Sequence, residues 1–256
     1  MLKLRKSETG RALVMGHRGA EALAPENTMA AFEAGLKAGA DLLELDVQLT
    51  ADDRVIVFHD FTLGRKTPDP QWVRDVTWEE IGQLDVGSWF DPRYADQRVP
   101  LLEEVLAWAK GRVPLCIDLK TGFAFNHRLE ERVVELVERN QMVNEVVIIA
   151  WDQFALRRVK TLNPEIATGA ILCGRFVDLI PLARSLEVNW LSLWWEHSTS
   201  EEVAQAQEAG LAVNLVMFLP DYVKAVRMWV DIVEARDPGQ AKATLRDLGI
   251  LRVVEL

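Results

Sequence analysis

The fold is decided by residues 12–47, which read ALVMGHRGAEALAPENTMAAFEAGLKAGADLLELDV. This stretch begins and ends with apolar runs, at 12–16 and 41–47, that have the length and composition of buried strands. Between the runs, apolar residues recur at helical spacing on one face of a segment at 27–39: Met29, Phe32 and Leu36. A strand, a helix and a second strand in this order predict a parallel sheet with the helix packed against it.

The same alternation continues to the other end of the chain. Nine segments have the apolar pattern of buried strands: 12–16, 41–47, 54–58, 113–119, 145–150, 166–172, 189–193, 211–217 and 230–234. Helical periodicity is clearest in five others: 27–39, 127–140, 153–162, 200–210 and 221–229. This pattern predicts an α/β protein with a closed (β/α)8 TIM barrel, a fold that commonly takes about 250 residues. Because a barrel has eight places, one strand prediction is wrong or that strand lies outside the barrel.

Residues 60–100 break this alternation. They contain four prolines and six aromatic residues but no amphipathic helix of useful length. A loop of this size is uncommon in a compact domain unless it folds as a functional subdomain or a lid. The link between the second and third predicted strands is also too short for a crossover helix. We therefore expect one domain over residues 1–256, with an insertion at about 60–100 after the third predicted strand.

The composition is that of a globular protein with an excess of acidic residues. The chain has 29 Lys and Arg against 39 Asp and Glu, which gives a net charge of −10. This balance argues against a nucleic-acid partner, because phosphate backbones are bound by clustered Lys and Arg. The apolar run near the start is too short for a signal peptide or a membrane span, so we expect a cytoplasmic protein without stable membrane insertion. Cys116 and Cys173 lie in apolar runs and are expected to be buried.

Ionisable residues gather at the C-terminal ends of four predicted strands, where barrel active sites are built. They are His17 and Arg18 after the first strand, Glu44 and Asp46 in the second, His59 after the third, and Asp118 and Lys120 at the fourth. Residues two apart in a strand point to the same side, so Glu44 and Asp46 share one face. We therefore expect these side chains to meet at one mouth of the barrel.

The chemistry of these residues indicates a site that breaks phosphoesters. Three carboxylates cannot all ionise in a confined site without a cation, and their oxygen ligands suit Mg²⁺ or Ca²⁺ better than Zn²⁺. Arg18 offers a fork of donors to a phosphate, and Lys120 adds a second positive charge. The two histidines are suited to exchange protons near neutral pH.

Four motifs carry a resemblance to a known family: Gly16-His17-Arg18-Gly19, Pro25-Glu26-Asn27-Thr28, Glu44-Leu45-Asp46-Val47 and His59-Asp60. In these motifs and their spacing the sequence resembles glycerophosphodiester phosphodiesterases. The resemblance implies a TIM barrel with a small inserted subdomain, and metal-dependent hydrolysis of glycerophosphodiesters to glycerol 3-phosphate and an alcohol. It also implies site residues: His17 and His59 as the acid–base pair, Glu44, Asp46 and Asp118 around a divalent cation, and Arg18 and Lys120 facing the phosphate.

Some positions depart from the family pattern or have two interpretations. The family usually has Glu where Asp118 stands, and Ser-Phe-Asp where this chain has Ala150-Trp151-Asp152. Trp151 could pack at the rim of the barrel or form an aromatic wall for the alcohol. Glu26 and Asn27 could act in the site directly, or could bind the free backbone N–H groups at the start of the following helix.

Two other functions fit the same pattern. A related barrel phosphodiesterase could act on phospholipid head groups, and it would then need an apolar rim that faces a membrane. A non-catalytic homologue could bind a phosphorylated ligand only, but such a protein has no need for paired acid–base groups. The sequence predicts a small-molecule partner and leaves the oligomeric state open.

Overall fold

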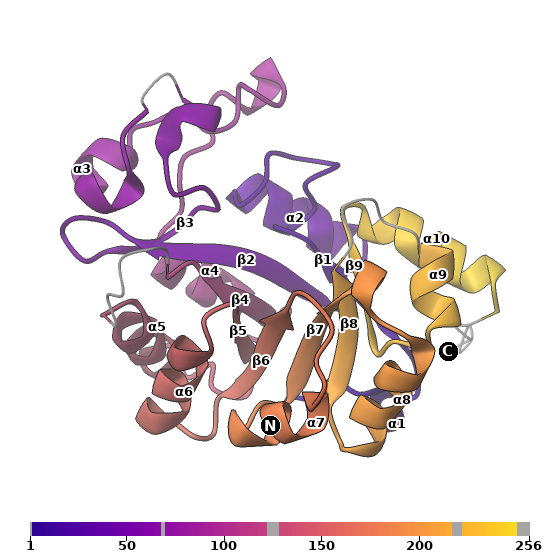
Figure 1. Cartoon of the computed structure of the whole chain (residues 1–256). Helices are drawn as coiled ribbons and strands as arrows, with labels where there is room; N and C mark the ends of the chain where they lie inside the picture. Colours follow the sequence, from indigo (N-terminus) through magenta and orange to yellow (C-terminus); the bar gives the residue numbers. More distant parts are fainter. Residues whose placement is uncertain (1, 68–69, 122–127, 217–221, 250–256) are drawn as a thin grey trace.

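A computed structural model of the chain describes residues 2–67, 70–121, 128–216 and 222–249, and it shows a barrel ringed by helices (Figure 1). The described strands form one sheet in the order β1-β9-β8-β7-β6-β5-β4-β2-β3, and β1 also pairs with β2. This last pairing closes a ring of eight strands, and all pairings within the ring are parallel. The predicted (β/α)8 TIM barrel is confirmed.

The elements agree with most of the predicted segments. The strands are β1 (Leu13–Gly16), β2 (Leu42–Leu49), β3 (Val55–Val57), β4 (Leu115–Leu119), β5 (Val146–Ala150), β6 (Ala167–Leu172), β7 (Trp190–Trp194), β8 (Ala212–Val216) and β9 (Ile232–Ala235). The helices are α1 (Lys6–Thr9), α2 (Met29–Lys37), α3 (Trp78–Ile81), α4 (Leu102–Ala109), α5 (Arg128–Arg139), α6 (Gln153–Leu162), α7 (Leu179–Ser185), α8 (Ser200–Glu208), α9 (Tyr222–Arg227) and α10 (Pro238–Asp247). Predicted element ends at 127, 217 and 221 lie outside the described residues. Within the described ranges, no helix is long and apolar enough to cross a membrane.

The strand without a place in the barrel is β3. It pairs antiparallel with the far end of β2, with Val57 opposite Val47. The two strands are joined by a tight turn in which Asp53 has φ +58° and the Arg54 N–H donates to Thr50 Oγ1 at 3.0 Å. The link that was too short for a crossover helix is therefore a hairpin turn.

Both faces of the barrel strands are covered by apolar side chains. Inside the barrel, Met15, Leu42 and Cys116 pack around Trp190 in one cluster. A larger cluster fills the space between the strands and the surrounding helices. Cys116 is buried as expected, but the expectation for Cys173 is wrong: it is exposed, because β6 ends one residue before it.

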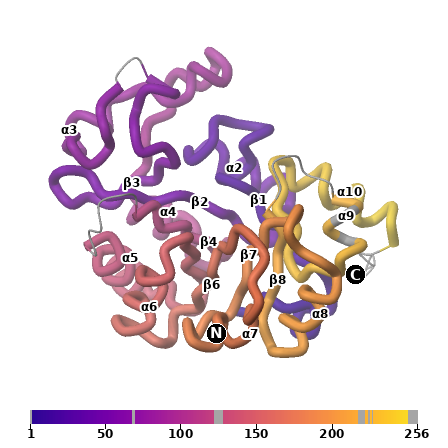
Figure 2. The backbone as a smooth tube through the Cα atoms, in the orientation of Figure 1, coloured from indigo at the N-terminus to yellow at the C-terminus, as the bar shows by residue number. Residues whose placement is uncertain are grey.

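The insertion at 60–100 folds as a lobe that projects from the barrel beside β2 and β3 (Figure 2). The regular structure in its described residues, 60–67 and 70–100, consists of α3 and three single-turn 3₁₀ helices: Leu63–Arg65, Val73–Asp75 and Pro92–Tyr94. Val73 and Ile81 from the lobe form an apolar cluster with Ile56 and Phe58, which belong to β3 and its end. The lobe therefore packs on the strand that precedes it, next to His59.

The loop after β1 is held tightly between that strand and α2. A Cβ atom at Gly16 would lie 2.0 Å from the carbonyl oxygen of Gly19, and one at Gly35 would lie 2.6 Å from the same oxygen. Only glycine permits this approach, because any Cβ would overlap the backbone. The packing fixes the loop that carries His17 and Arg18.

Candidate active site

Three carboxylates meet at the C-terminal mouth of the barrel, and we call them the acidic cluster. Glu44 and Asp46 lie on β2, and Asp118 lies on β4 in register with Asp46. One oxygen of each residue lies within 4.8 Å of the others, and all three residues are buried. This cluster could hold a metal ion, because carboxylate oxygens are the ligands that hard divalent cations prefer.

The crowding of three acids changes how each of them ionises. Burial and the charge of Asp46 raise the pKa of Glu44 to about 8. Burial also raises the pKa of Asp118, whose Oδ1 atom is buried without a hydrogen-bond partner among the described residues. Burial acts on Asp46 too, but Lys120 and Arg18 hold its pKa well below the usual range. A divalent cation would stabilise the ionised acids and take the free Asp118 oxygen as a ligand, so the residues fit a metal.

The two cations predicted to face a phosphate lie against the acidic cluster. Lys120 Nζ is 2.9 Å from Asp46 Oδ1 and also contacts Asp118 Oδ2. Arg18 Nε is 3.3 Å from Asp46 Oδ2, and the Arg18 backbone N–H donates to Glu44 Oε2 at 2.7 Å. The structure thus brings all five charged residues from three strand ends into one site.

Asn27 is hydrogen-bonded to the acidic cluster and does not cap a helix. Its Nδ2 donates to Asp46 Oδ2 at 2.7 Å, and its Oδ1 accepts from the Asp46 N–H at 3.2 Å. The residue has φ +58°, a left-handed conformation that these two contacts hold in place. Helix α2 is capped by Thr28, whose hydroxyl accepts from the Ala31 N–H. The capping interpretation is therefore wrong for Asn27 and for Glu26.

Glu26 lies beside three cations. Its Oε1 atom is 3.0 Å from Arg18 Nη1, 2.5 Å from Arg65 Nη2 and 2.8 Å from Lys66 Nζ. Burial works against its ionisation, but Arg65, Lys66 and Arg18 together lower the pKa of Glu26 to about 2. Because Arg65 and Lys66 belong to the inserted lobe, Glu26 ties the lobe to the β1 end of the site.

His17 is surrounded by carboxylates. Its Nδ1 is 3.2 Å from Glu21 Oε1, and its Nε2 is 3.7 Å from Glu234 Oε1 and 4.0 Å from Glu44 Oε2. Burial disfavours the charged ring, but Glu234, Glu21 and Glu44 outweigh it and raise the pKa of His17 to about 10. Neither Glu21 nor Glu234 was predicted from the sequence. A signal existed for Glu234, because it is an ionisable residue at the C-terminal end of the last predicted strand.

His59 follows β3 and is held from two sides. Its Nδ1 is 2.7 Å from Asp60 Oδ1, and Asp60 also contacts Arg65. Gln48 Nε2 donates to the carbonyl oxygens of Phe58 and Asp60 at 2.8 and 2.7 Å, so β2 fixes the backbone on both sides of His59. The charge of His59 contributes to the lowered pKa of Asp46, as expected for a ring near the acidic cluster.

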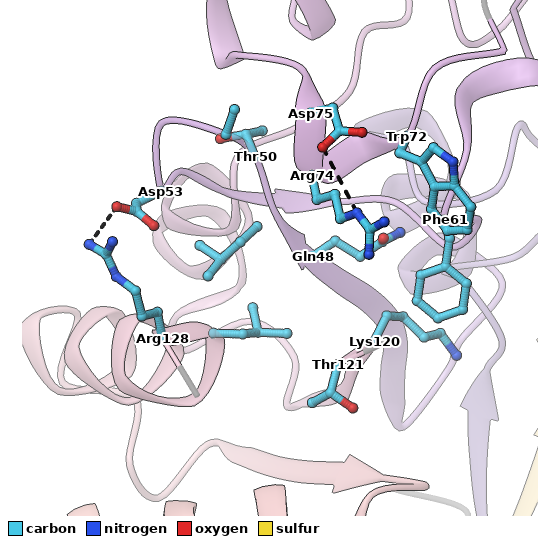
Figure 3. A pocket seen from close by; sticks show the side chains of 13 residues that line it. Gln48, Thr50, Asp53, Phe61, Trp72, Arg74, Asp75, Lys120, Thr121 and Arg128 are labelled. Atoms are coloured by element: carbon cyan, nitrogen blue, oxygen red, sulfur yellow. Dashed lines mark ion pairs between the residues drawn. The ribbon is translucent and has the colours of Figure 1, made fainter. Parts of the chain in front are cut away.

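Two pockets are lined by cations that contact the acidic cluster, one by Arg18 and the other by Lys120. The His17 pocket has a volume of about 440 Å³, and its wall includes Trp151 and Trp194, whose ring centres are 6.2 Å apart. Trp151 is 48% exposed, so it lies at the rim of this pocket. The Lys120 pocket has a volume of about 320 Å³, and Figure 3 shows Phe61 and Trp72 on one of its walls, above Lys120.

Comparison with known proteins agrees with this geometry. The profile of the Glycerophosphoryl diester phosphodiesterase family matches residues 17–232, which is most of the chain. The chain belongs to this family. A Glycerophosphodiester phosphodiesterase from Caldanaerobacter subterraneus subsp. tengcongensis is 37% identical over 231 residues, which cover 89% of this chain and 95% of the relative. The resemblance carried by the four motifs is confirmed.

Solved structures of similar proteins share the phosphodiesterase fold. An Oleispira antarctica phosphodiesterase in complex with the product sn-glycerol-3-phosphate has a TM-score of 0.87 and 24% identity, and the match covers 93% of this chain and 98% of that one. A glycerophosphodiester phosphodiesterase from Agrobacterium tumefaciens has a TM-score of 0.77 and 26% identity, with 91% and 99% covered. The family fold therefore extends over nearly the whole chain.

Proposed function

We propose that this member of the glycerophosphoryl diester phosphodiesterase family hydrolyses glycerophosphodiesters to glycerol 3-phosphate and an alcohol, with Mg²⁺ or Ca²⁺ held by the acidic cluster. The observation that carries the proposal is the convergence of the acidic cluster, two cations and two imidazoles between two pockets. A phosphodiester has one anionic centre and two substituents, which this arrangement matches. The name of the relative at 37% identity supports the same activity.

The proposed mechanism assigns a task to each charged residue. Arg18 and Lys120 bind and orient the phosphate oxygens. One imidazole accepts the proton of the glycerol hydroxyl next to the phosphate, that oxygen attacks phosphorus, and the other imidazole donates a proton to the leaving alcohol. Water then opens the cyclic phosphate with the two roles reversed. A divalent cation bound by Glu44, Asp46 and Asp118 would polarise the phosphoryl group as a Lewis acid.

The hydrogen-bond partners of the two imidazoles support their role as a pair. In each ring Nδ1 faces a carboxylate, Glu21 for His17 and Asp60 for His59. A carboxylate at Nδ1 fixes the tautomer of the ring and leaves Nε2 available to the substrate. In His17, Nε2 lies beyond hydrogen-bond distance of the two nearby carboxylates, at 3.7 Å from Glu234 and 4.0 Å from Glu44. A protein that only bound a phosphorylated ligand would gain nothing from two such oriented bases.

We assign the alcohol of the substrate to the Lys120 pocket and the glycerol to the His17 pocket. Phe61, Trp72 and Arg74 of the inserted lobe line the Lys120 pocket, so the most irregular part of the chain meets the variable part of the substrate. Loops vary more readily than the scaffold that carries them, which suits a pocket that sets specificity. On this assignment Trp151 packs at the glycerol side.

The experiment is an assay of glycerol 3-phosphate release from a panel of glycerophosphodiesters, with and without a chelator. We expect metal-dependent release from at least one diester, and no release after chelation. Release of lysophosphatidic acid or of a phosphorylated head group from lysophospholipid vesicles, with no glycerol 3-phosphate from any diester, would favour the phospholipid function. Binding of glycerol 3-phosphate without turnover of any diester would favour the non-catalytic function. Either result would overturn the proposal.

We further propose that residues 1–256 work as one catalytic domain, in which the insertion at 60–100 is part of the site. Support comes from the ion pairs of Arg65 and Lys66 with Glu26, and from the apolar cluster that the lobe shares with Phe58. The cytoplasmic location expected from the sequence stays a prediction, to be checked by cell fractionation.

A further inference from the structure

Glu234 is a carboxylate of the site that the mechanism above does not use. It lies on β9, and its side chain is 19% exposed in the His17 pocket. Its Oε1 atom is 3.7 Å from His17 Nε2. Among the described residues it is not part of the group of acids whose oxygens lie close enough to share a metal. Its position therefore calls for a task other than metal binding.

A series of hydrogen bonds inside the barrel leads to Glu234 and fixes the position of its carboxylate. Asn214 Oδ1 accepts from Trp190 Nε1 at 2.7 Å and from Ser192 Oγ at 2.5 Å. An indole N–H can only donate, so the Asn214 atom that faces it must be the oxygen. The Asn214 amide nitrogen then faces the opposite way and donates to Glu234 Oε2 at 3.3 Å.

All residues in this series of hydrogen bonds come from consecutive barrel strands. Trp190 and Ser192 lie on β7, Asn214 lies on β8, and Glu234 lies on β9. Trp190, Ser192 and Asn214 are buried. Most buried polar groups in proteins are hydrogen-bonded, and the Asn214 amide forms these bonds in one orientation only. Glu234, the last acceptor in the series, is therefore held in a fixed position next to His17.

We propose that Glu234 is a positioning residue that holds the His17 ring in its catalytic orientation. Glu21 lies at Nδ1 and is itself 2.6 Å from Arg236, while Glu234 lies at Nε2 and is held by Asn214. A ring bounded by a fixed carboxylate near each nitrogen cannot rotate freely about its side-chain bonds. His17 needs this support because it lies on a loop and not within a strand. The inference rests on the proposed function, in which His17 transfers a proton.

The test compares Glu234→Gln and Glu234→Asp with Glu196→Gln, a matched loss of one carboxylate at an exposed position. Both Glu234 variants should lower kcat by about 10-fold to 100-fold, the range found when a group that orients a metal-ligating histidine is removed. KM for the diester should change by less than about twofold, because uniform substrate binding is unaffected. Glu234→Asp keeps the negative charge, but the shorter side chain does not reach the His17 ring. A loss of kcat in both variants therefore indicates that contact with the ring is needed, and that the charge alone is not sufficient. Glu196→Gln should behave as wild type.

Two further measurements separate positioning from a merely structural role. In a His17→Ala background, Glu234→Gln should cause no further loss of single-turnover rate, because its effect passes through the missing ring. Nuclear magnetic resonance of the His17 ring should show displaced signals in Glu234→Gln and unchanged ones in Glu196→Gln. Wild-type kcat in both Glu234 variants, or an equal loss with and without His17, would overturn the inference. If the wild type cleaves no diester, the proposed function fails, and the ring signals still decide whether Glu234 holds His17.

Discussion

Asp46 and Asp118 lie directly opposite each other on neighbouring parallel strands, and both side chains are buried at the mouth of the barrel. Two like charges in register on one face repel each other unless a cation lies between them. Lys120 supplies one positive charge at 2.9 Å from Asp46, and Asp118 Oδ1 keeps a lone pair without a partner among the described residues. This arrangement is the physical basis for the metal dependence that we predict.

Chelation should abolish diester cleavage, and Mg²⁺, Mn²⁺ or Ca²⁺ should restore it. Glu44→Gln and Asp46→Asn should weaken metal binding measured by titration calorimetry. Burial and Asp46 raise the pKa of Glu44 to about 8, so its ionised form destabilises the metal-free fold. The stability of chelated Glu44→Gln at pH 8 should therefore equal or exceed that of chelated wild type. Full turnover by stripped enzyme in excess chelator would contradict the metal assignment.

Removal of either His17 or His59 should lower turnover by about 10²-fold to 10⁴-fold, the usual contribution of a positioned acid or base. The double variant should lose much less than the product of the two single losses, because the residues act as one unit. The measurement is the single-turnover rate of each variant. His197→Ala is the control, since His197 lies in an exposed turn and should be dispensable.

A diester whose neighbouring glycerol hydroxyl is replaced by hydrogen should bind without reacting. The mechanism needs that hydroxyl as the nucleophile, while Arg18 and Lys120 still bind the phosphate. We expect competitive inhibition by the deoxy analogue and no product in single-turnover assays. Equal rates for the analogue and the parent diester would instead indicate direct attack by water.

The stabilisation that ionised Glu26 provides should be lost at acidic pH, so the free energy of unfolding should fall there. Its folded-state pKa of about 2 lies below the ordinary value of 4.5, so its contribution is present above pH 4.5 and is lost as the pH falls through 2. Glu26→Gln should cost roughly 3 kcal/mol at pH 7, and its difference from wild type should shrink toward pH 2. Urea denaturation at several pH values measures this. Glu33→Gln, on the exposed face of α2, should cost less than about 1 kcal/mol. A difference that is constant with pH would contradict the assignment.

Trp72→Ala should change which alcohol the enzyme accepts. Loss of one aromatic contact, worth about 1 kcal/mol, should raise KM roughly fivefold for diesters with the larger alcohols. Inhibition by glycerol 3-phosphate should not change, because the glycerol occupies the other pocket. Trp151→Ala should show the opposite pattern, and Trp229→Ala, on the far surface beside Lys6, should show neither. If Trp151→Ala alone altered alcohol preference, the two pockets would have to be exchanged.

The sequence alone determined the barrel and the main charged residues of the candidate site. Strand and helix periodicities are local, and the carboxyl ends of parallel strands converge, so polar residues at those ends could be placed together from their order in the chain. This is why Glu44, Asp46 and Asp118 were found as a group. The spacing of the four motifs is also a property of the sequence, and it was sufficient to indicate the family.

Some residues have a sequence pattern that fits two different contacts, and only the tertiary structure decided which contact each of them makes. Glu26 and Asn27 carry the same signal whether they cap a helix or bind a distant side chain, and their partners lie on β2 and in the inserted lobe. The contact between His17 and Glu234 joins the first strand end to the last, so no local pattern contains it. The place of β3 outside the barrel also depended on its antiparallel pairing with β2. Local periodicity specifies elements, whereas contacts between residues far apart in the chain exist only once those elements are packed.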